Sequence, residues 1–233
     1  MSYLPSIVKH LRAKLLGRRT YEITKSYIKR FLPSNPLIVE GGAHIGKDTI
    51  EMAEIWPEGK IFAFEPVPDL HAQLLAKTRT VNNVRCYPVA LSDFTGSATM
   101  YVSSGDSDGS SSLLMPKEHI SEHPNVRFSE EIQVETITLD EWADKEAIDH
   151  VDFLWLDMQG HELAILKASP RMLNSARAIH TEVSLKETYR GVPLYPEFRH
   201  WMENKGFKVV REALPWPDMG NVLFVNRSWD GRH

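Results

Sequence analysis

Residues 39–46 read Val-Glu-Gly-Gly-Ala-His-Ile-Gly, and this stretch decides the fold of the chain. It continues the apolar run of residues 37–38 and leads into a segment from about 46 to 56 with the pattern of a helix. A short apolar run bounded by glycine is typical of a buried parallel strand. Glycines also permit a tight turn and a close approach of the backbone to a bound nucleotide or amino-acid group. The stretch therefore predicts a strand that turns through Gly41 and Gly42 into a helix at the edge of a ligand cleft.

Outward from this turn, apolar strands alternate with helices. We expect further strands over 60–64, 84–89, 99–102, 151–156 and 178–183, and helices over 68–79, near 139–143, from 161, and after 193 through 201. Such alternation predicts parallel strands with right-handed crossovers. The last two strands, 208–211 and 222–225, are joined by only about ten residues without a helical pattern, so we expect them to pair antiparallel.

The composition fits one compact domain. The chain has 233 residues, of which 42% are hydrophobic and 25% charged. A net charge of −4 gives no general attraction to nucleic acid. The single cysteine, Cys86, excludes an intrachain disulfide and suits a cytoplasmic setting. Because no long apolar run is present, we expect neither export nor a membrane span.

Two segments lie outside the regular alternation. Residues 1–35 predict a helical extension with two helices, ahead of a domain over 36–233. Between Lys9 and Arg30 this extension carries eight basic residues against one acid, which suits either a solvated basic face or peripheral contact with an anionic surface. Residues 103–112 are rich in Ser, Gly and Asp and predict a mobile loop over the cleft.

The glycine turn allows three other interpretations: a dinucleotide site, a phosphate site and a turn without a ligand. The dinucleotide pattern G-x-G-x-x-G lacks its first glycine here. Gly41, Gly46 and Lys47 satisfy the phosphate-loop pattern, but Asp48 stands where that loop needs a hydroxyl for magnesium, and its carboxylate would oppose phosphates. A glycine turn without any ligand is the third possibility.

An acid follows the second strand, in the sequence Phe-Ala-Phe-Glu-Pro over 62–66. Glu65 stands 19 residues beyond Gly46, where a carboxylate can accept hydrogen bonds from ribose hydroxyl groups. The alternative is a solvated acid that caps a helix. The pairing with the glycine turn favours ribose binding.

A second acid follows the strand over 151–156. Asp157 and Glu182 are expected on neighbouring strand ends, where they orient a substrate or bind magnesium, and His161 can accept a proton near neutral pH. For His161 the alternative is an exposed residue at a helix start. For Glu162 it is an acid that is stabilised at a helix N-terminus.

Together these residues resemble the FkbM family of methyltransferases, over about 37–226. Residues 40–46 are similar to the family's D-x-G-A-N-x-G motif, residues 64–66 to its E-P element, and residues 90–93 and 138–140 to further parts of its pattern. Residues 151–162 resemble its V-D-F-L-K-I-D-x-E-G-x-E signature. The chain departs from the family at Glu40, His44, Trp155 and Gln159, and Gln159 removes an acid that a metal scheme with three carboxylates would use.

The resemblance implies a class I, S-adenosylmethionine-dependent methyltransferase that acts on a hydroxyl group of a sugar, glycoconjugate or polyketide. It implies a Rossmann-like α/β fold with a doubly wound, mostly parallel, seven-stranded sheet and an antiparallel last strand. On this basis we expect the cofactor-binding residues to be Glu40, Gly41, Gly42, Ala43, His44, Glu65, Pro66, Ala90, Leu91 and Asp157. With the strand-end positions above, we expect the catalytic residues to be Asp157, His161 and Glu182.

Some points stay open at this stage. The resemblance does not decide whether a divalent metal takes part or whether the chain forms an oligomer. Two other functions also remain: a nucleotide hydrolase that uses the loop 41–47, and a non-catalytic module that binds the cofactor, for which the changes at Trp155 and Gln159 leave room.

Overall fold

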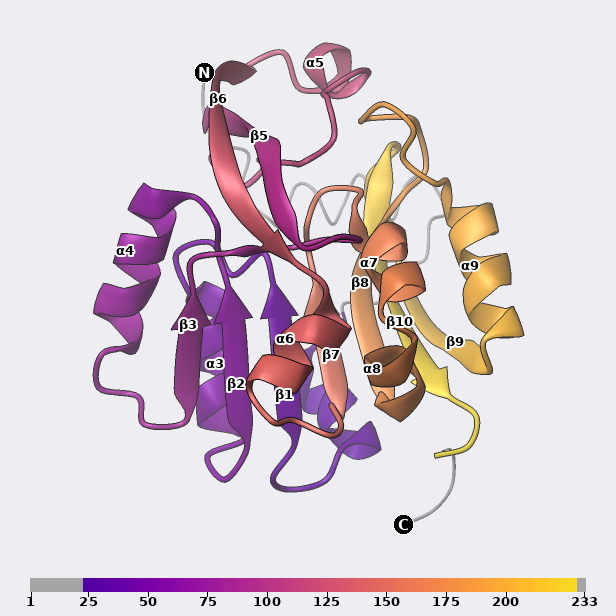
Figure 1. Cartoon of the computed structure of the whole chain (residues 1–233). Coiled ribbons are helices and arrows are strands. Elements are labelled where there is room, and N and C mark those ends of the chain that lie inside the picture. The colour runs from indigo at the N-terminus through magenta and orange to yellow at the C-terminus, as the bar shows by residue number, and fades with distance from the viewer. Residues whose placement is uncertain (1–22, 230–233) are drawn as a thin grey trace.

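The computed structural model describes residues 23–229, and its centre is a seven-stranded sheet (Figure 1). The strand order is β3-β2-β1-β7-β8-β10-β9. The strands of this sheet are β1 (Leu37–Gly41), β2 (Lys60–Phe64), β3 (Val84–Tyr87), β7 (Phe153–Leu156), β8 (Ala178–Ser184), β9 (Phe207–Ala213) and β10 (Met219–Asn226). The helices are α2 (Lys25–Ile28), η1 (Lys29–Phe31), α3 (Lys47–Ile55), α4 (Pro68–Thr78), α5 (His119–Glu122), α6 (Leu139–Lys145), α7 (Glu162–Ala168), α8 (Pro170–Ser175) and α9 (Tyr195–Asn204).

The strand directions confirm the predicted sheet. β1 pairs in parallel with both β2 and β7, β2 with β3, and β7 with β8, whereas β10 runs antiparallel to both β8 and β9. After β1, the chain adds β2 and β3 on one side of β1 and later adds β7 and β8 on its other side. Where the direction of strand addition reverses in this way, a crevice opens beyond the carboxyl ends of the strands, and α/β proteins bind ligands there.

Helices cover both faces of the sheet because alternate residues of each strand point to opposite sides. On one face, Val39, Phe62 and Leu154 belong to a core cluster that also contains side chains of α6, α7, α8 and α9. On the other face, Ile38 and Phe153 pack with residues of α3 and of the segment 23–32. The predicted helices over 46–56, 68–79 and 139–143 are confirmed as α3, α4 and α6.

The N-terminal extension lies only partly within the described residues. The first of the two predicted helices and most of the basic stretch lie outside them. The second predicted helix appears as α2 followed by η1. Lys25, one of the eight basic residues, is not on a solvated face, because it is buried and pairs with Asp48 and Glu51 of α3. The domain boundary after residue 35 remains a prediction.

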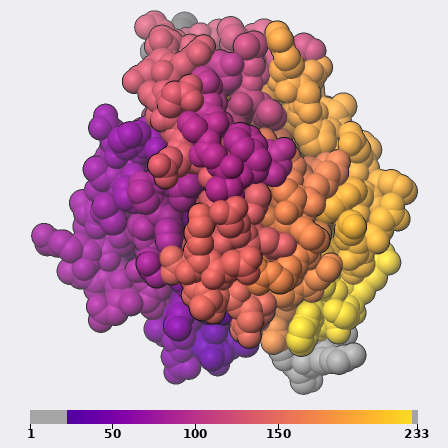
Figure 2. Space-filling model, viewed as in Figure 1, coloured from indigo at the N-terminus to yellow at the C-terminus, as the bar shows by residue number. Residues whose placement is uncertain are grey.

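A three-stranded sheet lies above the carboxyl ends of the main strands (Figure 1). It joins β4 (Ala90–Leu91), β5 (Gly96–Gly105) and β6 (Val126–Ile137), and β5 and β6 form a long antiparallel hairpin. The space-filling view shows the side chains of this hairpin and of α5 covering the top of the molecule (Figure 2). The sequence analysis found only residues 99–102 of β5 and missed β6.

Candidate functional site

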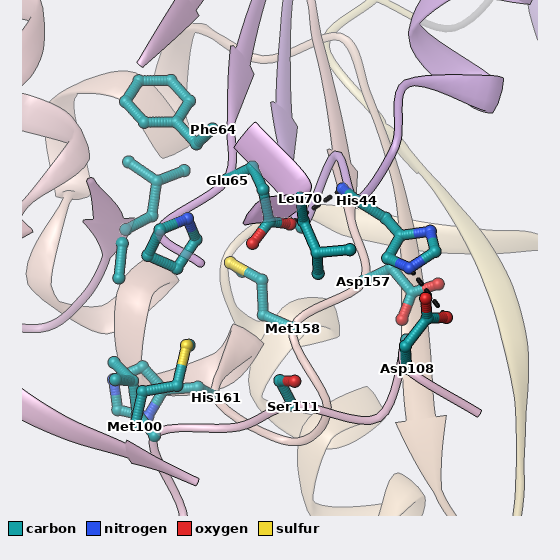
Figure 3. A pocket seen from close by; sticks show the side chains of 16 residues that line it. His44, Phe64, Glu65, Leu70, Met100, Asp108, Ser111, Asp157, Met158 and His161 are labelled. Atoms are coloured by element: carbon teal, nitrogen blue, oxygen red, sulfur yellow. Dashed lines mark hydrogen bonds and ion pairs between the residues drawn. The ribbon is translucent and has the colours of Figure 1, made fainter. Parts of the chain in front are cut away.

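A pocket lies at the carboxyl ends of β1, β2 and β7, beneath the hairpin (Figure 3). Its walls are formed by Gly42, His44, Phe64, Glu65, Pro66, Leu70, Ala90, Leu91, Met100, Asp108, Gly109, Ser111, Leu113, Asp157, Met158 and His161. Eight of the residues predicted from the sequence are among them: Gly42, His44, Glu65, Pro66, Ala90, Leu91, Asp157 and His161. Glu40, Gly41, Ala43 and Glu182 are not.

The glycine turn is pressed against the end of β7. Gly42 has φ +79°, and a Cβ atom on it would lie 1.9 Å from the carbonyl oxygen of Asp157. The amides of Gly42 and Ala43 both donate to the carbonyl of Phe64, at 3.1 and 2.9 Å. Because neither the φ angle nor the space admits a side chain, only glycine fits at position 42. The turn thus leaves bare backbone at the pocket wall.

Glu65 is held firmly at the end of β2. Its Oε2 accepts a hydrogen bond of 2.8 Å from the amide of His44, and its Oε1 accepts one of 2.9 Å from the amide of Val67. The residue is 5% exposed, and burial raises the pKa of its carboxyl while the two backbone hydrogen bonds lower it. Each carboxylate oxygen keeps further acceptor capacity. The carboxylate is therefore oriented before any ligand arrives and can accept hydroxyl donors.

Three of the predicted cofactor residues lie behind the turn rather than in the pocket wall. Glu40 is 1% exposed, and its carboxylate accepts a hydrogen bond of 2.6 Å from the hydroxyl of Thr49 in α3. Burial raises the pKa of Glu40 to about 8, against the effect of that hydrogen bond. A Cβ atom on Gly41 would lie 2.7 Å from the sulfur of Met158, and Ala43 packs in a small cluster with Leu74. These three residues support the turn from below.

The serine-rich segment closes one side of the pocket. Residues 103–105 belong to β5, so the predicted loop is shorter than 103–112. Nε2 of His44 lies 3.0 Å from Oδ1 of Asp108 in this segment, which joins the glycine turn to the loop (Figure 3). The hydroxyl of Ser103 accepts a hydrogen bond from the amide of Ser110 at 2.9 Å. The predicted position of the loop at the pocket is confirmed, and internal hydrogen bonds link its residues, whereas its mobility stays a prediction.

Asp157 and Glu182 come together through a third side chain. Nε2 of Gln159 donates to Oδ1 of Asp157 at 3.0 Å and to Oε1 of Glu182 at 3.1 Å. Asp157 is exposed at the pocket, yet the surrounding protein desolvates its carboxylate and raises its pKa. Burial and the neighbouring Asp157 carboxylate raise the pKa of Glu182 as well. The predicted proximity of these two acids is confirmed, and Gln159 is the residue that the prediction left out.

His161 does not join that pair. Figure 3 shows Asp157 and Asp108 on one side of the pocket and His161 beside Met100 on the other. Nε2 of His161 lies 3.2 Å from the hydroxyl of Ser92 and 3.4 Å from Oδ1 of Asp93. Burial lowers the pKa of His161, although the Asp93 carboxylate opposes this. The imidazole therefore belongs to the wall formed by Ala90 and Leu91.

Glu162 behaves as an acid at a helix start. It is the first residue of α7, and its Oε1 accepts a hydrogen bond of 2.7 Å from the amide of Met158. Burial raises its pKa to about 7, while hydrogen bonds from neighbouring backbone amides lower it. This geometry fits the alternative given above for Glu162, an acid that is stabilised at a helix N-terminus.

The phosphate-loop assignment does not fit this geometry. Lys47, which would have to reach a phosphate, is exposed and is absent from the pocket wall. Asp48 is paired with Lys25 instead of facing a magnesium ion. Within residues 23–229, no cluster of three or more His, Cys, Asp or Glu side chains is arranged to hold a metal ion, and no helix there is long and apolar enough to cross a membrane.

Several wall residues were not singled out from the sequence. Leu70, Met100, Leu113 and Met158 add apolar surface, and Asp108, Gly109 and Ser111 come from the loop. The Ser-, Gly- and Asp-rich composition of residues 103–112 predicted a loop at the cleft, but it did not single out these three residues. Met100 lies in the predicted strand over 99–102, but no spacing pattern shows that this strand lies over the pocket.

The chain is similar to methyltransferases in sequence and in fold. Residues 40–209 match the family described as "Methyltransferase FkbM domain". The 2-O-methyltransferase NoeI of Sinorhizobium fredii is 33% identical over 162 residues, which cover 67% of each chain. The methyltransferase sdnD of Sordaria araneosa is 27% identical over 226 residues, covering 84% of this chain and 83% of that protein.

Two solved structures share the fold. The methyltransferase FkbM of Methylobacillus flagellatus has a TM-score of 0.54 at 11% identity, and the alignment covers 94% of this chain but 59% of that one. The N-terminal domain of EvdMO1, described in the presence of SAH and D-fucose, has a TM-score of 0.50 at 13% identity. This alignment covers 96% of this chain and 97% of that one. The chain belongs to the FkbM methyltransferase family and is an S-adenosylmethionine-dependent methyltransferase.

Proposed function

We propose that this chain methylates a hydroxyl group of a sugar, glycoconjugate or polyketide-type acceptor. The observation that carries the proposal is one pocket with Glu65 at the end of β2 and Asp157 at the end of β7, on either side of the bare turn at Gly42. The printed name of NoeI, a 2-O-methyltransferase at 33% identity, supports a hydroxyl as the acceptor.

The cofactor fits the wall that includes Glu65. S-adenosylmethionine, when bound, supplies a methyl group on a positively charged sulfur that is already activated for transfer. In our proposal the Glu65 carboxylate accepts hydrogen bonds from the ribose hydroxyl groups, as acids in this position do in nucleoside-binding folds. The missing Cβ of Gly42 permits a ligand to approach the backbone closely. Pro66, Ala90 and Leu91 offer apolar surface to the base.

The remaining predicted cofactor residues have supporting roles in this proposal. Glu40, Gly41 and Ala43 hold the turn in shape from behind, and His44 contributes both its amide to Glu65 and its imidazole to the loop. We assign His161 to the wall beside Ala90 because Ser92 and Asp93 already engage its Nε2. It is therefore not our choice for the base.

Asp157 is the group that we propose as the base. Its carboxylate faces the pocket and would take the proton of an acceptor hydroxyl, while the bound cofactor would supply the methyl group and leave as S-adenosylhomocysteine. Glu182, bridged to it by Gln159, lies outside the pocket wall and acts through Asp157 by influencing the charge of that carboxylate. Alignment of the reacting atoms supplies much of the remaining acceleration because the methyl group is activated already.

The test uses S-adenosylmethionine with an isotopically labelled methyl group and a panel of methyl glycosides, oligosaccharides and hydroxylated polyketides. We expect label in one acceptor class, attached to oxygen, as seen by mass spectrometry and NMR. Asp157→Asn should lower kcat by about 10²- to 10⁴-fold, the usual contribution of a base, while S-adenosylhomocysteine still binds. Binding of S-adenosylhomocysteine without any labelled product in the panel would instead favour the non-catalytic module.

A further inference from the structure

Gln159 has an unusual backbone conformation for its residue type. Its φ angle is +56°, in the left-handed region that non-glycine residues seldom adopt, and its side chain is buried beside two acids. A residue in such a conformation is strained and persists only where its surroundings hold it in place. For Gln159 these surroundings are its hydrogen-bond partners.

The amide of Gln159 is fully used. Its two N–H groups point to Asp157 and to Glu182, and its Oε1 lies 3.0 Å from the hydroxyl of Tyr189, whose single proton it shares with a second acceptor. Two carboxylates on neighbouring strands repel each other when both are charged. A neutral amide that donates to both reduces this repulsion without a cation and without a shared proton.

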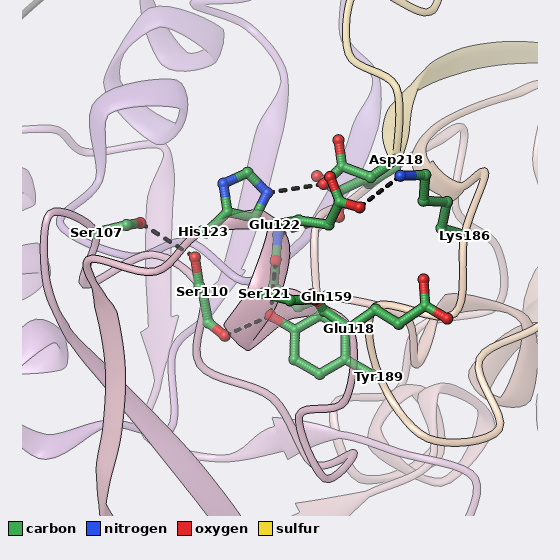
Figure 4. Close-up of polar contacts among 11 residues, drawn as sticks. Ser107, Ser110, Glu118, Ser121, Glu122, His123, Gln159, Lys186, Tyr189 and Asp218 are labelled. Atoms are coloured by element: carbon green, nitrogen blue, oxygen red, sulfur yellow. Dashed lines mark hydrogen bonds and ion pairs between the residues drawn. The ribbon is translucent and has the colours of Figure 1, made fainter.

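The same residue is tied to the loop over the pocket. The second acceptor of the Tyr189 proton is the carbonyl oxygen of Ser110, 2.7 Å from the hydroxyl (Figure 4). The Ser112 hydroxyl donates to the backbone carbonyl of Gln159 at 2.9 Å. Both the side chain and the backbone of Gln159 are therefore attached to the loop segment. Asp157 and the loop share one pocket, so this attachment fixes them relative to each other.

We propose that Gln159 is a positioning residue, whose amide holds the pocket carboxylate of Asp157 next to the carboxylate of Glu182 and links both to the loop through Tyr189. This inference rests on the proposed function, in which Asp157 faces the acceptor. A glutamate at position 159 would add a third carboxylate to the pair and would lose both donors.

The test compares the titration of Asp157 and Glu182, followed by carboxyl ¹³C NMR, in the wild-type protein and in Gln159→Met, which keeps the length of the side chain but has no donor. Other charges act on the pair in both proteins: Asp48 and His44 near Asp157, and Glu162 and Asp218 near Glu182. Because the Gln159 hydrogen bonds lower both pKa values, we expect both titration midpoints to rise in the variant. Unchanged midpoints would overturn the proposal.

Two further variants make the result specific. Gln133→Met, an exposed position on β6, is the matched control and should leave both midpoints unchanged. If Gln159→Met does not fold, Tyr189→Phe decides, because it frees the amide without touching either acid; a smaller rise supports the proposal and no change overturns it. These titrations need neither cofactor nor acceptor, so their failure is distinguishable from a failure to transfer methyl groups.

Discussion

At the scale of single residues, two glycines with nearly the same backbone angle provide a direct comparison. Gly42 and Gly191 have φ +79° and +74°, but a Cβ atom would meet Asp157 O at 1.9 Å in the first and nothing within 4 Å in the second. Left-handed backbone costs a non-glycine residue about 1–2 kcal/mol in either position. Of these two positions, only position 42 would add a clash between the new Cβ atom and the backbone of Asp157.

We therefore expect Gly191→Ala to lower the free energy of unfolding by about 1–2 kcal/mol. Gly42→Ala should lower it clearly more and should abolish binding of S-adenosylhomocysteine. Urea denaturation and calorimetry of both variants measure these effects. Equal losses of stability in the two variants would mean that the turn does not press against β7 as described.

Glu65 and Lys47 separate the two ligand classes that the glycine turn allows. Glu65→Ala removes the carboxylate that we assign to the ribose, and the affinity for S-adenosylhomocysteine should fall by about 10- to 100-fold, or about 1.4–2.7 kcal/mol. Lys47→Ala serves as the control, because this exposed side chain is absent from the pocket wall. Unchanged affinity in Glu65→Ala would remove Glu65 from the cofactor site.

Residue identity and spacing predicted where acids stand along the chain, but not where each side chain points. Glu65 and Asp157 directly follow their strands and do line the pocket. Glu40 lies within β1, and its carboxylate turns into the interior toward Thr49. His161 follows the same strand as Asp157, yet its ring reaches Ser92 on the opposite wall. Side-chain direction depends on packing with segments distant in sequence, which a motif does not encode.

At the scale of elements, the hydrogen bond between Glu40 and Thr49 joins β1 to α3, and the burial of the Glu40 carboxyl between them makes stability depend on pH. Burial raises the pKa of Glu40 from 4.5 to about 8, so the folded protein retains a proton that the unfolded chain releases near pH 4.5. The stability from this group is fully present below about pH 4.5 and is lost as the pH rises to about 8.

Glu40→Gln removes this titration. Between pH 5 and 8 the free energy of unfolding should fall less in the variant than in the wild-type protein, by a difference on the order of a few kcal/mol at most. Glu162, with a pKa raised to about 7, leaves a smaller fall in the same direction in both proteins. Urea denaturation at several pH values measures the difference. Parallel pH curves would show that Glu40 is ionised in the folded state.

Element prediction succeeded where a segment is buried in the main sheet. The apolar runs of β1, β2, β7 and β8 read as strands because both of their faces are covered. β6 was missed because its middle is exposed and carries Glu130 and Glu131, so its sequence resembles a polar loop. The helix predicted from 161 divides into α7 and α8, since Pro170 starts a new helix.

At the scale of the whole molecule, the strand order explains why distant residues meet. β1 lies between β2 and β7, so the glycine turn at its end has Glu65 on one side and Asp157 on the other. The β5–β6 hairpin and its loop then cover the carboxyl ends of these strands (Figure 1). The alternation of strands and helices predicted this sheet, whereas the cover depends on a hairpin whose second strand the pattern did not reveal.

The central claim is that this pocket binds the methyl-donor cofactor, and titration calorimetry with S-adenosylhomocysteine tests it most directly, with ATP and magnesium in parallel. We predict a Kd in the micromolar range for S-adenosylhomocysteine, corresponding to about −8 kcal/mol, and no heat of binding for ATP with magnesium. Binding of ATP with magnesium, together with no binding of S-adenosylhomocysteine, would contradict the claim and point to the phosphate-loop alternative.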